Sequence, residues 1–193
     1  MSGLSVAELV ARTRARLPER ARRVVPPGSL IRAAVLVPIV DHGEAFLVFS
    51  QRTNRVGQHA GQISFPGGRI DPEDADELQA AVREAEEEVG LARTLVEPLG
   101  MLDDTETVAT QFVITPWVGL VTGPVVWQPD GYEIEKVIEV PVGALLARGA
   151  FRVESWERNG VTRDVYFYDY QDTTIWGATA RILKQYLDIV QAP

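Results

Sequence analysis

The sequence predicts an α+β fold, an α/β/α sandwich in which a mixed β-sheet lies between helices. Two β-branched apolar runs, at 31–40 and 45–51, indicate strands, and the turn-forming "DHGE" between them indicates a hairpin. Apolar residues at helical spacing predict amphipathic helices near both ends of the chain, over 4–24 and 176–190. A chain of 193 residues is long enough for one domain with a sizeable core.

The middle of the chain supplies the remaining strands and helices. An acidic helix is expected over 76–89, with Asp74 or Asp76 as its cap and Gly90 just after its end. Pro141 begins a short helix over 141–149. The other patterns indicate strands at 61–65, 98–104, 112–121 and 137–140, and a hairpin of 151–158 and 163–170 around the turn Asn159-Gly160. We therefore expect a single domain over 1–193, with an N-terminal helical extension over 1–28.

Composition excludes several kinds of protein. The sequence has no cysteine, which rules out disulfides, cysteine nucleophiles and thiolate zinc sites. It has no apolar run of 18 residues, so no membrane span or membrane partner is expected. The N-terminus lacks a secretory signal pattern, and its arginines fit an amphipathic helix better than an organellar transit peptide. We expect a cytoplasmic protein, and these observations are compatible with a homodimer.

The net charge of −8 is distributed unevenly. Residues 1–60 carry nine basic and four acidic groups, whereas residues 68–91 carry nine acidic and two basic groups. This balance is unlike that of a nucleic-acid-binding domain, so no nucleic-acid partner is expected. An acidic pocket beside a basic flank suits a divalent cation that recruits an anionic small-molecule substrate.

Helical geometry places the carboxylates of the acidic helix on different faces. At about 100° per residue, Leu78, Val82, Ala85 and Val89 share the face expected to meet the core. Glu84, Glu87 and Glu88 converge on another face, whereas Glu86 lies nearer the apolar edge. Three neighbouring carboxylates form a hard-oxygen site for Mg²⁺ or Mn²⁺.

A solvated acidic helix is the simpler interpretation of the "EAEEE" stretch alone, because glutamate is a good helix former. The upstream Gly67-Gly68 pair favours a site instead, because glycine lets backbone approach a ligand closely.

The segment 68–91 resembles the signature box of the Nudix hydrolase family. Its second half matches fully over Arg83–Leu91, "REAEEEVGL". Its first half differs, because Asp74 stands where the family has glutamate and the loop before Arg83 is one residue longer. The departure resembles the coenzyme A pyrophosphatase branch, as do the upstream "RTNRVGQHAGQISFPGG" and the C-terminal "IWGATARIL".

The resemblance implies a Nudix-like fold and metal-dependent hydrolysis of a nucleoside diphosphate linked to another group. Glu84, Glu87 and Glu88 would bind Mg²⁺ or Mn²⁺, with the Gly68 carbonyl as a further ligand. Arg83 would orient the glutamates, but the shifted Asp74 leaves its partner open. The candidate general bases are five glutamates: Glu84, Glu87, Glu133, Glu135 and Glu139.

Coenzyme A would be cut to 3′-phosphoadenosine 5′-phosphate and 4′-phosphopantetheine. Arg52, Arg55, His59 and Gly67 are the expected substrate-binding residues, because a buried phosphate needs cationic or donor partners. Phe65, Trp117 and Trp127 could stack on adenine, although core packing is the simpler role for each. Two alternatives stay open: a Nudix hydrolase acting on ADP-ribose or NADH, and a catalytically silent Nudix module that only binds.

Overall fold

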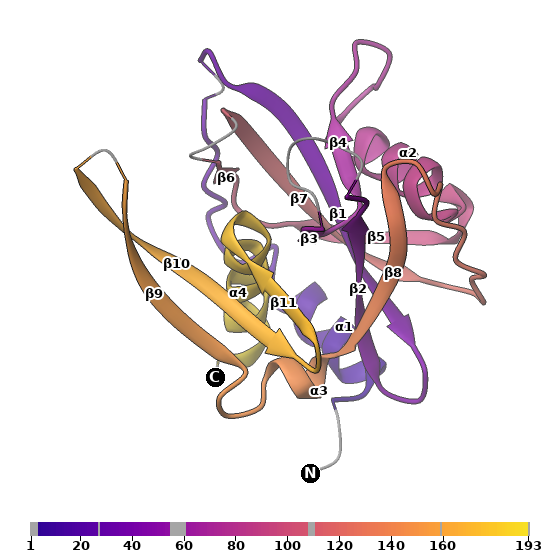
Figure 1. Ribbon diagram of the computed structural model, residues 1–193. Helices are drawn as coiled ribbons and strands as arrows, with labels where there is room; N and C mark the ends of the chain where they lie inside the picture. The colour runs from indigo at the N-terminus through magenta and orange to yellow at the C-terminus, as the bar shows by residue number, and fades with distance from the viewer. Residues whose placement is uncertain (1–3, 27, 55–60, 108–110, 159, 193) are drawn as a thin grey trace.

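The computed structural model describes residues 4–26, 28–54, 61–107, 111–158 and 160–192 (Figure 1). Its larger sheet has eight strands, and only the pair β1 and β7 runs parallel, so the sheet is mixed as expected. The strands of this sheet are β1 (Ile31–Asp41), β2 (Ala45–Arg52), β3 (Ile63–Ser64), β4 (Gly67–Arg69), β5 (Val96–Met101), β6 (Thr105–Glu106), β7 (Phe112–Val121) and β8 (Ile134–Pro141).

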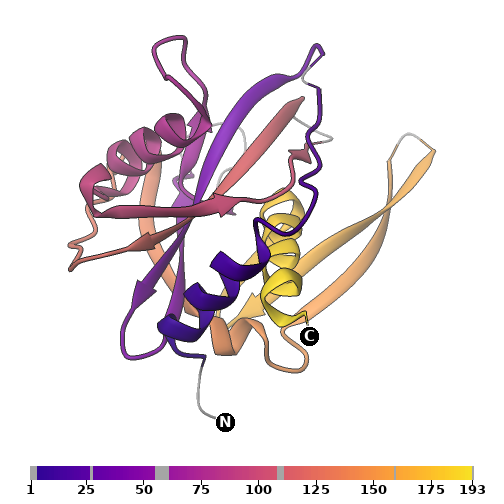
Figure 2. The ribbon, with the colours of Figure 1, turned by 180° about the vertical axis from the view of Figure 1, so that it is seen from behind.

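Helices cover both faces of this sheet, which confirms the α/β/α arrangement (Figures 1 and 2). The helix α2 (Glu77–Val89) covers one face, and α1 (Val6–Arg16) and α4 (Gly177–Gln191) cover the other. Strand β1 explains the two-sided core, because alternate residues point to opposite faces. Val35 and Val37 join the cluster under α1 and α4, whereas Ala34 and Leu36 join the cluster under α2.

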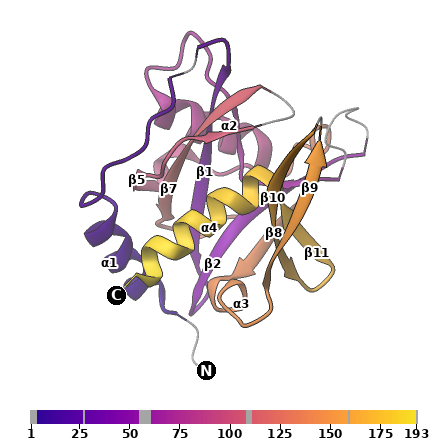
Figure 3. The same ribbon diagram turned by 90° about the vertical axis from the view of Figure 1, so that its left-hand side faces the viewer.

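The C-terminal hairpin forms a sheet of its own, which the sequence analysis did not separate from the main sheet. Strands β9 (Phe151–Arg158), β10 (Val161–Tyr170) and β11 (Thr173–Trp176) are antiparallel in the order β11-β10-β9. The strand β11 was not predicted, since its four residues directly precede α4. In Figure 3, α4 crosses in front of the larger sheet with the smaller sheet beside it. The short helices α3 (Val142–Leu145) and η1 (Arg93–Leu95) connect strands.

The N-terminal helix is shorter than predicted, because α1 ends at Arg16 rather than continuing to residue 24. Pro18 accounts for the end, since a proline disfavours helical backbone at the residue before it and has no N–H to donate. The expected apolar face is confirmed by the buried Leu9, Val10 and Leu17. No helix in the described part of the chain is long and apolar enough to span a membrane.

Helices α1 and α4 also make polar contacts with each other. The hydroxyls of Thr13 and Tyr186 form a buried 2.8 Å hydrogen bond. The Arg16 guanidinium donates to the carbonyls of Ile189 and Val190 at 3.1 and 2.6 Å. Carbonyls in the last turn of a helix lack intrahelical donors, so Arg16 supplies partners that α4 cannot provide for itself.

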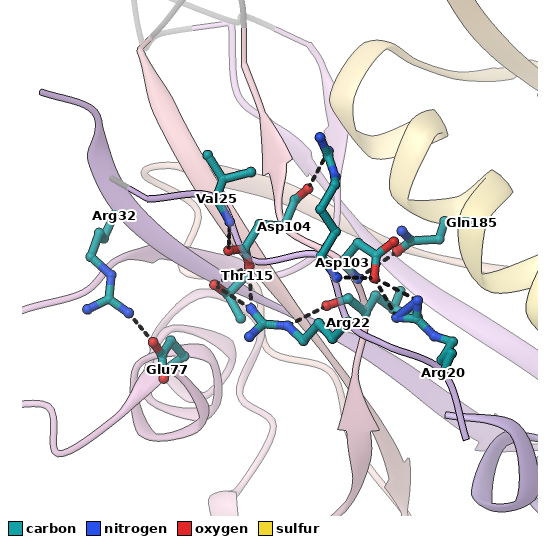
Figure 4. Close-up of polar contacts among 11 residues, drawn as sticks. Arg20, Arg22, Val25, Arg32, Glu77, Asp103, Asp104, Thr115 and Gln185 are labelled. Atoms are coloured by element: carbon teal, nitrogen blue, oxygen red, sulfur yellow. Dashed lines mark hydrogen bonds and ion pairs between the residues drawn. The ribbon is translucent and has the colours of Figure 1, made fainter. Parts of the chain in front are cut away.

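The chain after α1 is held by two neighbouring aspartates rather than by helical packing (Figure 4). Asp104, whose side chain is 4% exposed, pairs with Arg22 and accepts hydrogen bonds from the Val25 N–H and the Thr115 hydroxyl, each at 2.9 Å. Asp103 is more exposed and accepts two hydrogen bonds from Arg20, at 2.6 and 2.8 Å. These arginines are therefore structural and are not free to bind substrate.

We predict that Asp104→Ala destabilises the protein much more than Asp103→Ala. The first change leaves the half-buried Arg22 charge without its partner and costs about 3–5 kcal/mol. The second breaks a more exposed pair and costs about 1 kcal/mol. Urea unfolding of both variants measures the difference, and equal losses would show that burial does not set the strength of these pairs.

Candidate active site

The helix α2 begins and ends close to the predicted residues. Asp76 is its N-cap and accepts a hydrogen bond from the Gln79 N–H, while Gly90 ends it in the left-handed conformation at φ 74°. Its buried face differs in part from the prediction. Ala85 and Val89 are buried as expected, but Leu78 and Val82 are only half-buried. The remaining buried positions are Ala80, Ala81 and Glu88.

The Gly67-Gly68 pair forms the short strand β4, which pairs with β1 directly beside α2. A side chain at Gly67 would collide with backbone, since its Cβ would lie 2.4 Å from the Ala34 carbonyl oxygen. A Cβ at Gly68 would instead meet the Glu84 carboxylate, 2.5 Å from its nearer oxygen. Both glycines are required for close approach, one to a strand and the other to a carboxylate.

Glu88 is buried, with 8% of the residue exposed. Its carboxylate accepts a 3.1 Å hydrogen bond from the Gly67 N–H, which ties the helix to β4. Burial raises the pKa of Glu88 to about 8, and this rise exceeds the lowering by the Gly67 hydrogen bond. Arg52 and Glu133 act on the same pKa in opposite directions, so both charges lie near this carboxyl.

Glu84 lies one helical turn before Glu88, with its carboxylate against Gly68. Burial raises the pKa of Glu84, and the neighbouring Arg83 partly opposes this effect. The helix α2 therefore directs Glu84 and Glu88 toward the glycine strand, β4. Both are partly removed from water, which is the condition under which carboxylates gain most from an added cation.

Arg83 organises the acidic groups around it. It makes two hydrogen bonds to Asp74, at 3.0 and 2.9 Å, and single ones to Glu84 at 3.0 Å and Glu87 at 3.2 Å. Its Nη2 also donates to the Arg69 carbonyl at 3.1 Å. The hydrogen bonds from Arg83 lower the pKa of Asp74. The partner left open by the shifted spacing is thus Asp74, which the longer loop places against the guanidinium.

The three glutamates do not converge as fully as the helical geometry predicted. Glu88 points to the buried side and Glu87 is an exposed partner of Arg83, with 57% of its side chain accessible. In the described ranges no group of three or more His, Cys, Asp or Glu side chains is placed to hold a metal ion. One guanidinium nevertheless faces four carboxylates, those of Asp71, Asp74, Glu84 and Glu87. The expected ligands Glu84, Glu87 and Glu88 offer only carboxylate oxygens, and such donors fit Mg²⁺ or Mn²⁺ in their chemistry.

A second wall of the site comes from the end of β2 and the turn before β8. Arg52 pairs with Glu133 at 3.1 Å, and its buried Nε has no hydrogen-bond partner in the described structure. Asp130, which the sequence analysis missed, accepts hydrogen bonds from the N–H groups of Tyr132, Glu133 and Ile134. The Pro-Asp-Gly turn signal at 129–131 could have revealed it.

This turn is also tied to the acidic helix, because the Asp130 N–H donates to the Glu88 carbonyl at 3.1 Å. Of the expected substrate-binding residues, Arg52 and Gly67 lie beside Glu88. Arg55 and His59 are outside the described residues.

The other candidate residues lie elsewhere. The Glu139 carboxylate accepts a 2.9 Å hydrogen bond from Trp127 Nε1 and lies 3.0 Å from His42 Nε2, in a separate cavity. Glu135 is exposed. Phe65 is 2% exposed and stacks on Phe49 with ring centres 4.6 Å apart, so it belongs to the core.

The chain is similar to a known protein family and to several known proteins. The family model described as the NUDIX domain matches residues 30–159. A protein named "Uncharacterized Nudix hydrolase NudL" from Yersinia enterocolitica is 34% identical over 95% of this chain and 92% of its own length. Its namesake from Photorhabdus laumondii is 35% identical over 97% of this chain and 99% of its own length. The solved C. elegans Ap4A hydrolase binary complex has a TM-score of 0.49 and 22% identity, covering 58% of this chain and 81% of that one.

A mixed sheet between helices, with an acidic helix against a glycine strand, is the arrangement expected of a Nudix fold. The chain belongs to the Nudix hydrolase family.

The two glycines predict different effects for two alanine variants, one on stability and the other on activity. Gly67→Ala forces a side chain against β1 and places alanine at φ +150°, so it should cost roughly 2–4 kcal/mol of stability. Gly68→Ala meets only the movable end of Glu84, so stability should fall by less than about 1 kcal/mol. Hydrolysis should nevertheless fall at least about tenfold, because Glu84 is displaced. Thermal unfolding and diphosphate hydrolysis test the pair, and full activity in Gly68→Ala would contradict a role for Glu84 at this position.

Proposed function

We propose that this Nudix hydrolase cleaves the diphosphate of coenzyme A or its derivatives, giving 3′-phosphoadenosine 5′-phosphate and 4′-phosphopantetheine. The observation that carries the proposal is the position of the coenzyme A-like signature. It starts at Arg52, beside Glu88, and ends at the glycine strand. The two described ends of the segment that resembles a substrate signature therefore lie at the candidate diphosphate site. The names of the relatives specify the family but no substrate.

In this proposal Glu84, Glu87 and Glu88 hold Mg²⁺ or Mn²⁺, with the Gly68 carbonyl as a further ligand. The bound ions would neutralise the diphosphate charge and lower the pKa of a bound water. Arg83 positions the carboxylates, since it contacts Glu84 and Glu87 while Asp74 fixes its own orientation. These contacts keep the acidic groups assembled when no cation balances them.

We assign the general base to Glu133 among the alternatives left open. Glu133 pairs with Arg52, and its charge raises the pKa of the nearby Glu88 carboxyl. Glu139 instead contacts Trp127 and His42. The Glu133 N–H is held by Asp130, which limits the movement of the turn. A base must be fixed within reach of the water it deprotonates, and an anchored turn provides this.

The 3′-phosphate of coenzyme A needs cationic partners. Arg52 supplies one, because its side chain is 27% exposed and its only ion pair among the described residues is with Glu133. Arg55 and His59 are proposed to complete this subsite, in keeping with their places in the signature.

Product analysis after incubation with coenzyme A and Mn²⁺ tests the substrate. We expect 3′-phosphoadenosine 5′-phosphate to accumulate, with a kcat/KM for coenzyme A at least about tenfold above that for ADP-ribose or NADH. Glu133→Gln should lower kcat strongly, while Glu135→Gln, at the exposed neighbour, should not. Faster cleavage of ADP-ribose would favour the alternative hydrolase, and no cleavage of any of the three would favour the binding module.

Metal-linked stability tests the ligand assignment without relying on turnover. Saturating Mg²⁺ or Mn²⁺, at about 100 times its dissociation constant, should stabilise the fold by about 2.7 kcal/mol. The rise in melting temperature should shrink in Glu84→Gln and Glu87→Gln. Glu86→Gln is the matched control, since Glu86 is an exposed glutamate paired with Arg93 at 2.6 Å. Equal stabilisation of all three variants would refute the assignment.

A further inference from the structure

The hairpin of β9 and β10 extends away from the rest of the molecule (Figures 1 and 2). The smaller sheet has the order β11-β10-β9, so β9 is an edge strand whose ladder partner is β10. An edge strand presents unpaired backbone N–H and C=O groups that can pair with another chain.

Apolar side chains are exposed along this hairpin. Val153, Trp156 and Val161 are 46%, 45% and 50% exposed. The Trp156 ring packs on Phe167 and Trp176, with ring centres 5.8 and 5.7 Å away. The packing fixes the orientation of the indole while leaving much of it accessible. An exposed, oriented tryptophan is the kind of residue that is enriched in protein interfaces.

We propose that β9 pairs antiparallel with β9 of a second copy of this chain, about a two-fold axis centred on Trp156. Opposite residues of an antiparallel pair point to the same face, so a symmetric pairing of one strand with itself must be centred on a residue. Centring on Trp156 places it against its counterpart and places Glu154 opposite Arg158 twice. The Arg158 side chain is exposed and makes no ion pair within the described ranges, so its charge is free to make this contact. Glu154 already pairs with Arg152 and accepts a 2.8 Å hydrogen bond from Trp156 Nε1, so it would be shared between its own strand and the second copy.

The neighbouring registers are unfavourable. Centring on Ser155 places Arg152 opposite Arg158, and centring on Glu154 places the two glutamates against each other. Like charges directly opposite destabilise a strand pair, whereas opposite charges stabilise it. Centring on Val153 also places opposite charges together, Arg152 against Glu154 twice, but these two side chains are already paired within the strand and Arg158 gains no partner. Charged side chains often protect edge strands from pairing, but centring on Trp156 gives the Arg158 charge a partner.

The order of charges along β9 therefore favours a second copy of this chain as its partner. A two-fold interface uses the same surface on both chains, so its residues must complement one another. Glu154, Trp156 and Arg158 satisfy this condition. The inference does not depend on which substrate the enzyme cleaves.

Charge reversal tests the pairing through sedimentation equilibrium over a range of protein concentrations. The wild type should form a dimer, and Arg158→Glu should weaken it at least about tenfold, since two attractive pairs become repulsive. The double variant Glu154→Arg with Arg158→Glu should restore the affinity. Arg148→Glu, at an exposed site before β9, makes the same charge change and should have no effect. A monomeric wild type, or a dimer insensitive to Arg158→Glu, would overturn the proposal.

Cysteine pairing tests the register, because the natural sequence has no cysteine. Residues directly opposite in an antiparallel pair have Cα atoms about 4.5–5.5 Å apart, within the range for a disulfide. A mixture of Glu154→Cys and Arg158→Cys chains should form an oxidised heterodimer, whereas neither variant should cross-link alone. Cross-linking of one variant with itself would indicate another register, and the absence of any cross-link would argue against pairing through β9. Either result overturns the proposal.

Discussion

The close approach of β4 to β1 depends on the absence of a side chain at Gly67. Any Cβ there would meet the backbone of Ala34 and Val35, so the two strands could not pair at this separation. This pairing places the Gly67 N–H where it reaches Glu88 and places Gly68 under the carboxylate of Glu84. The candidate active site is therefore a consequence of one tight strand contact, and the helix α2 gains its orientation from the same contact.

A second constraint is electrostatic. The helix concentrates negative charge that would be unfavourable on its own, and Arg83 distributes a single positive charge over Asp74, Glu84 and Glu87. Asp74 differs from the others because its two hydrogen bonds fix the plane of the guanidinium. The loop before Arg83 is one residue longer than in the family, but it still places the Asp74 carboxylate against the guanidinium. The ion pair of Arg83 is therefore kept.

The sequence predicted features that arise from local periodicity. The apolar runs located β1, β2 and β7, and the capping residues located α2 to within one residue. It failed where distant residues decide the outcome. The N-terminal helix stops at Arg16, and the chain beyond it extends to reach Asp103 and Asp104. Helical geometry grouped Glu84, Glu87 and Glu88, but only the fold shows that Glu88 is buried against β4. The role of Asp130 likewise depends on a turn closing over the end of α2.

The contact between α1 and α4 has a consequence for the order of folding. Thr13 is synthesised 173 residues before its partner Tyr186. The apolar face of α1, including Leu9 and Val10, therefore has no complete packing surface until α4 has been made. Contacts between such distant residues slow folding, because a long loop must close before they form. Helix α1 is thus among the last elements to be secured, and its apolar face stays incompletely covered until α4 forms.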